Sequence, residues 1–204
     1  MSTPSEFDQQ YAREQLRRAR HPLRRLVKKY YLRNTLKDIS GATIDFGCGA
    51  GQLLECLPPG SVGLEVNPYL IRELTDRGLD VRFYDGTRDD FELLLFEPGR
   101  FSTLVMSHVL EHFPNASEVL RKLLRSCRRL RVQRVVIVVP GKRGFRADAT
   151  HKTMVDRRLL DAQGLMACEG YRLGKASYFP MDVELIGDYF AFHELKVIYE
   201  RIPE

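Results

Sequence analysis

The chain has 204 residues, of which 44% are apolar, and a formal net charge of +5. This length supports one well-buried α/β core and leaves no room for a separate catalytic domain of ordinary size. No apolar run approaches the ~20 residues that cross a bilayer, the first residues are polar, and four cysteines form no Cys-x-x-Cys pair, so we expect a cytoplasmic protein without disulfides or a cysteine zinc site.

Basic side chains dominate the first part of the chain. Between Arg13 and Lys37 the single acid is Glu14, and the basic residues are Arg13, Arg17, Arg18, Arg20, Arg24, Arg25, Lys28, Lys29, Arg33 and Lys37. An apolar stripe accompanies them, made of Leu23, Leu26, Val27, Tyr30 and Tyr31. We therefore expect residues 1–38 to form a basic amphipathic helical extension, followed by one main domain over residues 39–204.

A glycine-rich turn follows the first apolar run. A buried strand over 42–46 leads into Asp45-Phe46-Gly47-Cys48-Gly49-Ala50-Gly51, and a helix is expected over 51–57. Such a turn points backbone N–H groups at a ligand. A dinucleotide fingerprint requires glycine at position 52, where this chain has Gln52, so the spacing favours a nucleoside without a pyrophosphate.

A second strand, expected over 61–65, ends in the carboxylate of Glu65. It lies roughly 20 residues after the first glycine, the spacing at which an acidic side chain accepts hydrogen bonds from ribose hydroxyls. Together the two motifs resemble those of the class I S-adenosylmethionine (SAM)-dependent methyltransferases, of the small-molecule or glycan type represented by the methyltransferase 11 and 23 domains. The resemblance implies SAM as cofactor. It also implies a cofactor site made of Asp45, Gly47, Cys48, Gly49, Gly51, Glu65, Val66, Asp85, Gly86, Ser107 and His108.

The remaining elements alternate between strand and helix, the pattern of a parallel sheet covered on both faces. Strands are expected near 80–84, 101–106 and 134–139, with helices near 68–77, 90–95, 117–130 and 155–168. The helix over 117–130 has leucines at i, i+3, i+4 spacing and Ser117 as its expected N-cap. Two last strands, 171–178 and 194–199, form the antiparallel hairpin that the resemblance implies. The expected fold class is α/β: a Rossmann-like open sheet, mostly parallel, with helices on both faces.

Two segments after strands bear on the ligand. Asp85-Gly86 resembles the acidic position beside the adenine, although an ordinary Asp-Gly turn explains it equally well. The segment 106–114, which contains Ser107 and His108, resembles the one that lies along SAM and the substrate. His108 and His112 are four residues apart and could share a helix face, but no third ligand is spaced nearby, so we expect no metal.

The loop over 140–151 holds the candidate acceptor chemistry. His151, in this loop, is the first candidate for a general base, because imidazole titrates near neutral pH. His108 is the second candidate. Asp148 could orient either ring or contact the substrate. The alternative is that His151 caps the following helix or packs beneath the loop.

Charge indicates what kind of acceptor to expect. A second basic face lies opposite the leucines of 117–130 and consists of Arg121, Lys122, Arg125, Arg128, Arg129, Arg131 and Arg134. Such faces attract the phosphates of RNA, of an anionic membrane surface or of a nucleotide-linked sugar, although solvated helix faces are equally common.

The favoured function is SAM-dependent methyl transfer to a small-molecule or glycan acceptor, on oxygen. Phosphate-bearing acceptors are included, and nucleic acid is not favoured. The alternatives are an RNA methyltransferase that grips the RNA backbone with its basic helices, and a non-catalytic SAM-binding subunit. An Asn-Pro-Pro-Tyr motif, typical of enzymes that methylate base amines in DNA, is absent.

Overall fold

The computed structural model describes the backbone of residues 8–20 and 22–203, and the side chains of 8–17 and 28–203. Part of the basic, apolar-striped extension expected from the sequence lies outside the described side chains: Arg18, Arg20, Leu23, Arg24, Arg25, Leu26 and Val27. Within the described backbone, two helices form this part of the chain, α1 (Gln9–Arg20) and α2 (Pro22–Leu36). The division into an extension and a main domain at residue 38 remains a prediction.

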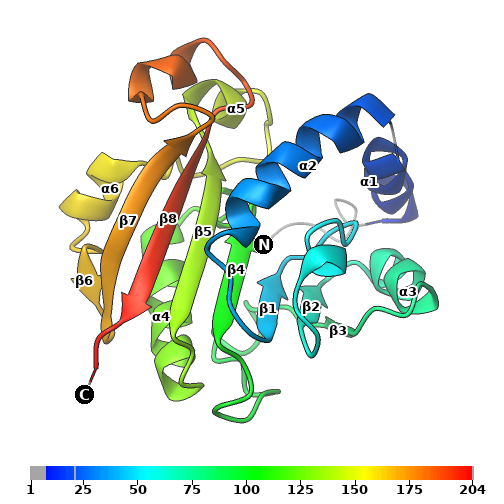
Figure 1. The fold of residues 1–204 in the computed structure, drawn as a ribbon, viewed down its shortest axis with the longest axis horizontal. Coiled ribbons are helices and arrows are strands. Elements are labelled where there is room, and N and C mark those ends of the chain that lie inside the picture. The colour runs from blue at the N-terminus through cyan, green and yellow to red at the C-terminus, as the bar shows by residue number, and fades with distance from the viewer. Residues whose placement is uncertain (1–7, 21, 204) are drawn as a thin grey trace.

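An eight-stranded sheet forms the centre of the molecule, in the order β3-β2-β1-β4-β5-β8-β7-β6 (Figure 1). The parallel strands are β1 (Thr43–Phe46), β2 (Val62–Glu65), β3 (Val81–Phe83), β4 (Thr103–Ser107) and β5 (Arg134–Pro140). Three antiparallel strands complete the sheet: β8 (Glu194–Arg201), β7 (Tyr171–Phe179) and β6 (Ala167–Cys168). The expected fold class and its C-terminal hairpin are therefore confirmed.

Helices cover both faces because alternate residues of each central strand point to opposite sides. Val105, Val136 and Val138 form a cluster with Leu53, against which leucines of α2 pack. Their neighbours Leu104, Met106 and Ile137 belong to the larger cluster on the other face, which contains the buried leucines of α4 (Ala116–Arg129). The remaining helices are α3 (Pro68–Asp76), α5 (Lys142–Arg146) and α6 (Arg157–Ala162).

Four local predictions are wrong. The segment 51–57 contains only a short 3₁₀ helix, Leu54–Cys56. The segment 90–95 is a series of turns, because buried Phe91 and Leu93 adopt positive φ angles of 63° and 54°, which a helix does not tolerate. The helix expected over 155–168 is limited to α6, since Asp156 caps its start and Gly164 turns the chain at φ 61°. In α4 the N-cap position belongs to Asn115 and not to Ser117.

The basic helix α2 is attached to the sheet by a buried lysine. Lys196 of β8 is only 3% exposed. Its ammonium group forms an ion pair with Asp38 and donates hydrogen bonds to Asn34, at 2.7 Å to the carbonyl and 3.1 Å to Oδ1. Arg134 adds a hydrogen bond of 3.2 Å to the carbonyl of Asp38. The chain that leaves α2 is thus held directly before it enters β1.

Among the described residues, no helix has both the length and the apolar character that crossing a membrane requires.

We predict that Lys196→Met lowers the free energy of unfolding by about 2–3 kcal/mol, because the substitution leaves the buried Oδ2 of the partly exposed Asp38 carboxylate without its partner. Urea unfolding measures the change. Lys175→Met on the neighbouring strand is the control, since Lys175 is exposed and its loss should change stability by about 0.5 kcal/mol or less. Equal losses in both variants would contradict the prediction.

Candidate cofactor and acceptor site

The carboxyl ends of β1, β2, β4 and β5 meet at one edge of the sheet, because these strands are parallel. The strand order reverses between β1 and β4, and ligands of open α/β sheets bind beside such a reversal. The antiparallel pairing of β8 places Glu194 opposite Pro140, so the start of β8 lies at the same edge. Residues from five strands or the loops after them therefore surround one region.

The glycine turn needs glycine for two different reasons. Gly47, Gly49 and Gly51 have φ angles of 74°, 53° and 76°, which other residues rarely adopt. A methyl group added to Gly47 would lie 2.4 Å from Cγ2 of Val109, so the turn packs directly on the segment after β4. Around Gly49, in contrast, the same addition would meet no atom within 4 Å. This is where the backbone is open to a ligand.

The carboxylate of Glu65 connects the glycine turn to the end of β2. Its Oε2 accepts a hydrogen bond from the Gly49 N–H at 2.8 Å, and its Oε1 accepts from the N–H groups of Val66 and Asn67 at 2.9 Å each. Burial raises the pKa of Glu65, and the three hydrogen bonds oppose that shift. A carboxylate has about four acceptor positions, so one position, on Oε2, remains for a ribose hydroxyl.

Asp45 is a buried acid beside the same turn. It is 2% exposed, and its Oδ2 accepts no hydrogen bond within the described part of the chain. Burial, together with the negative charge of Glu65, raises the pKa of Asp45 to about 7, although Lys28 of α2 acts in the opposite direction. A buried carboxylate without a hydrogen-bond partner is costly unless a cation binds nearby.

The other expected cofactor residues occupy the same edge. Asp85 accepts hydrogen bonds from the Thr87 N–H and hydroxyl at 3.1 and 2.7 Å, which is the geometry of a local turn, so its contact with adenine remains a proposal. Gly86 packs against Phe91, 2.6 Å from where its Cβ would be. Cys48 is buried in the glycine turn, and burial raises the pKa of its thiol. Ser107 ends β4 and is half-buried.

The N-terminal helix α1 reaches this edge. Asn67, fully buried, accepts hydrogen bonds from the N–H groups at the start of α3 and donates one of 3.2 Å to the carbonyl of Asp8. Ala12 of α1 is 1% exposed. α1 therefore packs close to Glu65.

His108 lies between two carboxylates. Its backbone is left-handed, with φ 56°, which is rare for a residue other than glycine. Nε2 lies 3.1 Å from Oε2 of Glu194 and Nδ1 lies 3.5 Å from Oε1 of Glu111. Burial alone would lower the pKa of His108, but the two carboxylates outweigh it and raise the pKa to about 9. The ring is therefore a cation at neutral pH, which disfavours His108 as a base.

His151 and His112 lie on the other side of Glu111. The ring of His151 stacks on Phe145 of α5 and meets the ring of His112 edge to face, with centroids 4.9 Å apart. Its Nδ1 lies 2.9 Å from the carbonyl of Phe145, and its Nε2 lies 3.8 Å from Oε1 of Glu111. The His151 side chain is therefore largely covered, and its Nε2 faces Glu111. Its role as a base remains a prediction.

Asp148 acts on this cluster through Thr150. Its Oδ1 accepts from the Thr150 hydroxyl at 2.7 Å, and the same hydroxyl oxygen lies 3.1 Å from Nδ1 of His112. Although partial burial would raise it, the hydrogen bonds from Thr150 hold the pKa of Asp148 below its usual range. Asp148 thus supports His112, whereas the sequence suggested His108 or His151.

Two carboxylates of this cluster, Glu111 and Glu194, were not among the predicted site residues. Glu111 stands beside His112 in the sequence, and that His-x-x-Glu-His spacing was the available signal. Glu194 has no local signal, because its position depends on the register between β5 and β8.

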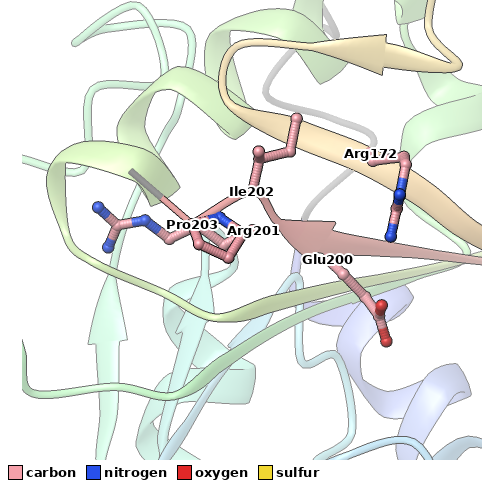
Figure 2. A pocket seen from close by; sticks show the side chains of 5 residues that line it. All are labelled: Arg172, Glu200, Arg201, Ile202 and Pro203. Carbon is pink, nitrogen blue, oxygen red and sulfur yellow. The ribbon is translucent and has the colours of Figure 1, made fainter.

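A hollow of about 360 Å³ lies elsewhere, at the opposite end of β8 (Figure 2). It is lined by Arg172, Glu200, Arg201, Ile202 and Pro203. None of the motif residues contributes to it, and it lies at the wrong edge of the sheet for an α/β ligand site.

Residues 11–179 match a family model described as a methyltransferase domain. The chain belongs to this methyltransferase family. It is a class I SAM-dependent methyltransferase, and SAM is its cofactor. No curated protein matches the chain by sequence.

Solved structures share the fold of this methyltransferase. A SAM-dependent methyltransferase from Archaeoglobus fulgidus is similar with a TM-score of 0.65 and 22% identity, over 87% of this chain and 94% of that chain. Magnesium protoporphyrin IX methyltransferase from Synechocystis, with bound SAH, aligns over 97% of both chains with a TM-score of 0.60 and 12% identity. The small RNA methyltransferase HEN1 gives a TM-score of 0.57 and 17% identity, over 86% of this chain and 25% of that chain.

We predict that Glu65→Ala weakens SAM binding to this methyltransferase by about 1.5–3 kcal/mol, the range for charge-assisted hydrogen bonds lost from a buried site. Calorimetric titration with SAM measures it. Asp76→Ala, an exposed acid at the end of α3, is the control. Circular dichroism confirms that the variant is folded, and unchanged SAM affinity in folded protein would remove Glu65 from the cofactor site.

We also predict a pH-dependent effect of Asp45→Asn. Because the folded-state pKa of Asp45 is raised to about 7, the stability that this group contributes is fully present below pH 4 and is lost as the pH rises through 7. Between pH 4 and pH 8 the free energy of unfolding of the Asn variant should therefore rise relative to that of the wild type. The expected rise is a few kcal/mol, at about 1.4 kcal/mol per pKa unit. Denaturant unfolding at several pH values tests this, and a difference that is independent of pH would contradict it.

Proposed function

We propose that this methyltransferase moves the methyl group of SAM to an oxygen atom of a small organic molecule or glycan, at the cluster of His108, Glu111 and His151. One observation carries the proposal. The segment that holds His108 and Glu111 packs through Val109 against Gly47 of the cofactor turn, so the cluster and the cofactor site are neighbours. Displacement at a sulfonium depends mainly on holding the nucleophile close to the methyl carbon.

The reaction needs one proton acceptor when the nucleophile is a hydroxyl. A lone pair of the acceptor oxygen forms the new O–C bond while the C–S bond breaks, and its electron pair stays on sulfur, which becomes a neutral thioether. We assign the hydroxyl proton to Nε2 of His151, because the carbonyl of Phe145 accepts the proton of Nδ1 and leaves Nε2 as the basic nitrogen. Asp148 contributes indirectly, through Thr150 and His112.

The rim of this edge favours an acceptor with an apolar part. Between β7 and β8, the segment 180–193 packs beside α5, where Lys142 pairs with Asp188 at 2.7 Å (Figure 1). Its side chains remain largely exposed, with Leu185 at 65% and Tyr189 at 74%. Met181, Val183 and Phe192 are exposed as well. Apolar surface of this kind binds organic groups better than a phosphate backbone.

The alternative of an RNA substrate loses support because basic residues on the α4 face, opposite its leucines, form ion pairs and hydrogen bonds within the molecule. Arg125 forms a two-point ion pair with Glu169, at 2.9 and 3.1 Å. Lys122 pairs with Asp90 and Glu118, and Arg129 donates to the carbonyls of Glu92 and Leu93. Measuring RNA binding at two salt concentrations separates the alternatives, since phosphate contacts weaken steeply with salt.

We predict that His151→Ala lowers the rate of methyl transfer by about 10²–10⁴-fold, the usual contribution of a positioned base. SAM affinity should stay within about twofold, because His151 lies on the acceptor side of the site. Transfer of a radiolabelled methyl group from SAM, with hydroxyl-bearing fractions of a cell extract as acceptors, gives the rate. Calorimetry gives the affinity.

Asp76→Ala serves as the control, because Asp76 is an exposed acid at the end of α3, away from this cluster. Nearly full turnover of His151→Ala, with an active wild type, would remove this residue from the reaction.

A further inference from the structure

Three side chains at the acceptor edge offer a set of metal ligands. One donor atom from each of Glu111, His112 and His151 lies within 4.8 Å of the other two. Donor atoms around a metal bound at 2.0–2.2 Å are roughly 3.4 Å apart. Small side-chain rotations would bring these three donor atoms to that separation. The missing third ligand was the reason to expect no metal from the sequence. The loop after β5 supplies it in His151, far along the chain.

Glu111 is the buried carboxylate at the centre of this set. It is fully buried, and neither carboxylate oxygen has a hydrogen-bond partner within the described residues. The nearest ring nitrogens, of His108 and His151, lie at 3.5 and 3.8 Å. Isolated buried carboxylates are unfavourable by several kcal/mol, and buried charges in proteins are paired or coordinate metals. Glu111 shares the His108 cation with Glu194, and no hydrogen bond reaches either of its oxygens among the described residues, so this carboxylate is the feature to explain.

The imidazoles of His112 and His151 are oriented as metal-binding imidazoles are. The Thr150 hydroxyl gives its proton to Asp148, so it must accept from Nδ1–H of His112. Nδ1 of His151 likewise donates to the Phe145 carbonyl. Each ring then keeps the lone pair of Nε2 for another partner. Donation of the second ring N–H to a carbonyl or to a carboxylate-linked group is the usual support of a metal-binding histidine.

We propose that Glu111, His112 and His151 bind a divalent first-row transition-metal cation. Two imidazoles and one carboxylate are a nitrogen and oxygen set that suits Zn²⁺ or Mn²⁺. His108 stays outside the set, since its Nε2 is engaged with Glu194. Asp148, Thr150 and Phe145 position the two rings without touching the metal.

A metal at this place deepens the proposed function, on which this consequence rests. An acceptor hydroxyl that binds the cation would have a lowered pKa and would release its proton to solvent before the oxygen attacks the methyl carbon. His151 is then a ligand, and the cation takes over the task assigned above to the free imidazole. The two roles of His151 differ in one measurable respect, the dependence of turnover on metal.

The test is calorimetric titration of chelator-treated, dialysed protein with Zn²⁺ and, separately, with Mn²⁺. We expect one equivalent to bind to the wild type. Glu111→Gln, His112→Ala and His151→Ala should each weaken binding at least tenfold, whereas Asp76→Ala, at an exposed acid of α3, should bind as the wild type does. Thr150→Val should weaken binding about 10–100-fold, the usual effect of losing a group that orients a ligand.

Absence of saturable binding to the wild type, or equal binding by the three ligand variants, would overturn the proposal. Should Glu111→Gln fail to fold, as judged by circular dichroism, the two histidine variants and Thr150→Val decide.

Titration of the metal-free protein with SAM separates this inference from the proposed function. SAM binding and metal-independent methyl transfer to a hydroxyl would leave the proposed function standing and refute the catalytic role of the metal. Metal binding at the three ligands without methyl transfer to any hydroxyl acceptor would support the site and refute the proposed function. Methyl transfer that stops on chelation and returns with Mn²⁺ or Zn²⁺ would support both.

Discussion

The carboxylate of Glu65 is the interaction on which the cofactor edge depends. Its three hydrogen bonds fix the glycine turn after β1 relative to the first residues after β2. One of these donors, Asn67, in turn caps α3 and bonds the carbonyl of Asp8 before α1. A single buried acid thereby sets the positions of two loops and, through Asn67, of two helices. The cost of burying the Glu65 carboxylate is offset by its hydrogen bonds to backbone N–H groups, which would otherwise lack acceptors.

Among the described residues at this edge, acidic groups outnumber the cations that pair with them, and SAM would balance part of that excess when bound. Asp45, Glu65, Glu111 and Glu194 are all buried there, while Lys28 and His108 are the nearby cations. SAM carries a sulfonium and an ammonium group, and we expect Asp45, beside the glycine turn, to gain a cationic partner when SAM binds. Glu65 is expected to accept from a ribose hydroxyl instead. Glu111 is on the acceptor side, where it shares the His108 cation with Glu194 and accepts no hydrogen bond among the described residues.

Local patterns predicted the parts of the fold that local chemistry determines. Positive φ angles at Gly47 and Gly51, and a carboxylate at the end of β2, follow from residue type and spacing. The segment 90–95 could not be predicted this way, because Phe91 and Leu93 adopt strained backbone angles to reach the core. The acceptor cluster could be predicted only in part from the sequence. His108 and His151 were candidates as residue types, but their distances to Glu111 and Glu194 depend on sheet register and on the path of a loop.

In the proposed function, the part of the site that binds SAM is separate from the part that selects the acceptor. SAM contacts are expected from turns directly attached to β1 and β2, whose positions the buried parallel sheet determines. In the proposed function the acceptor side is built from α5, the loop that holds His151 and the segment 180–193. Contacts such as the 2.8 Å hydrogen bond from Arg143 to the Tyr189 carbonyl and the ion pair of Lys142 with Asp188 join α5 to that segment. Substitutions in that outer layer leave the sheet and Glu65 untouched. Acceptor preference can therefore change without loss of the cofactor site, and the exposed apolar side chains of 180–193 are where such a change would act.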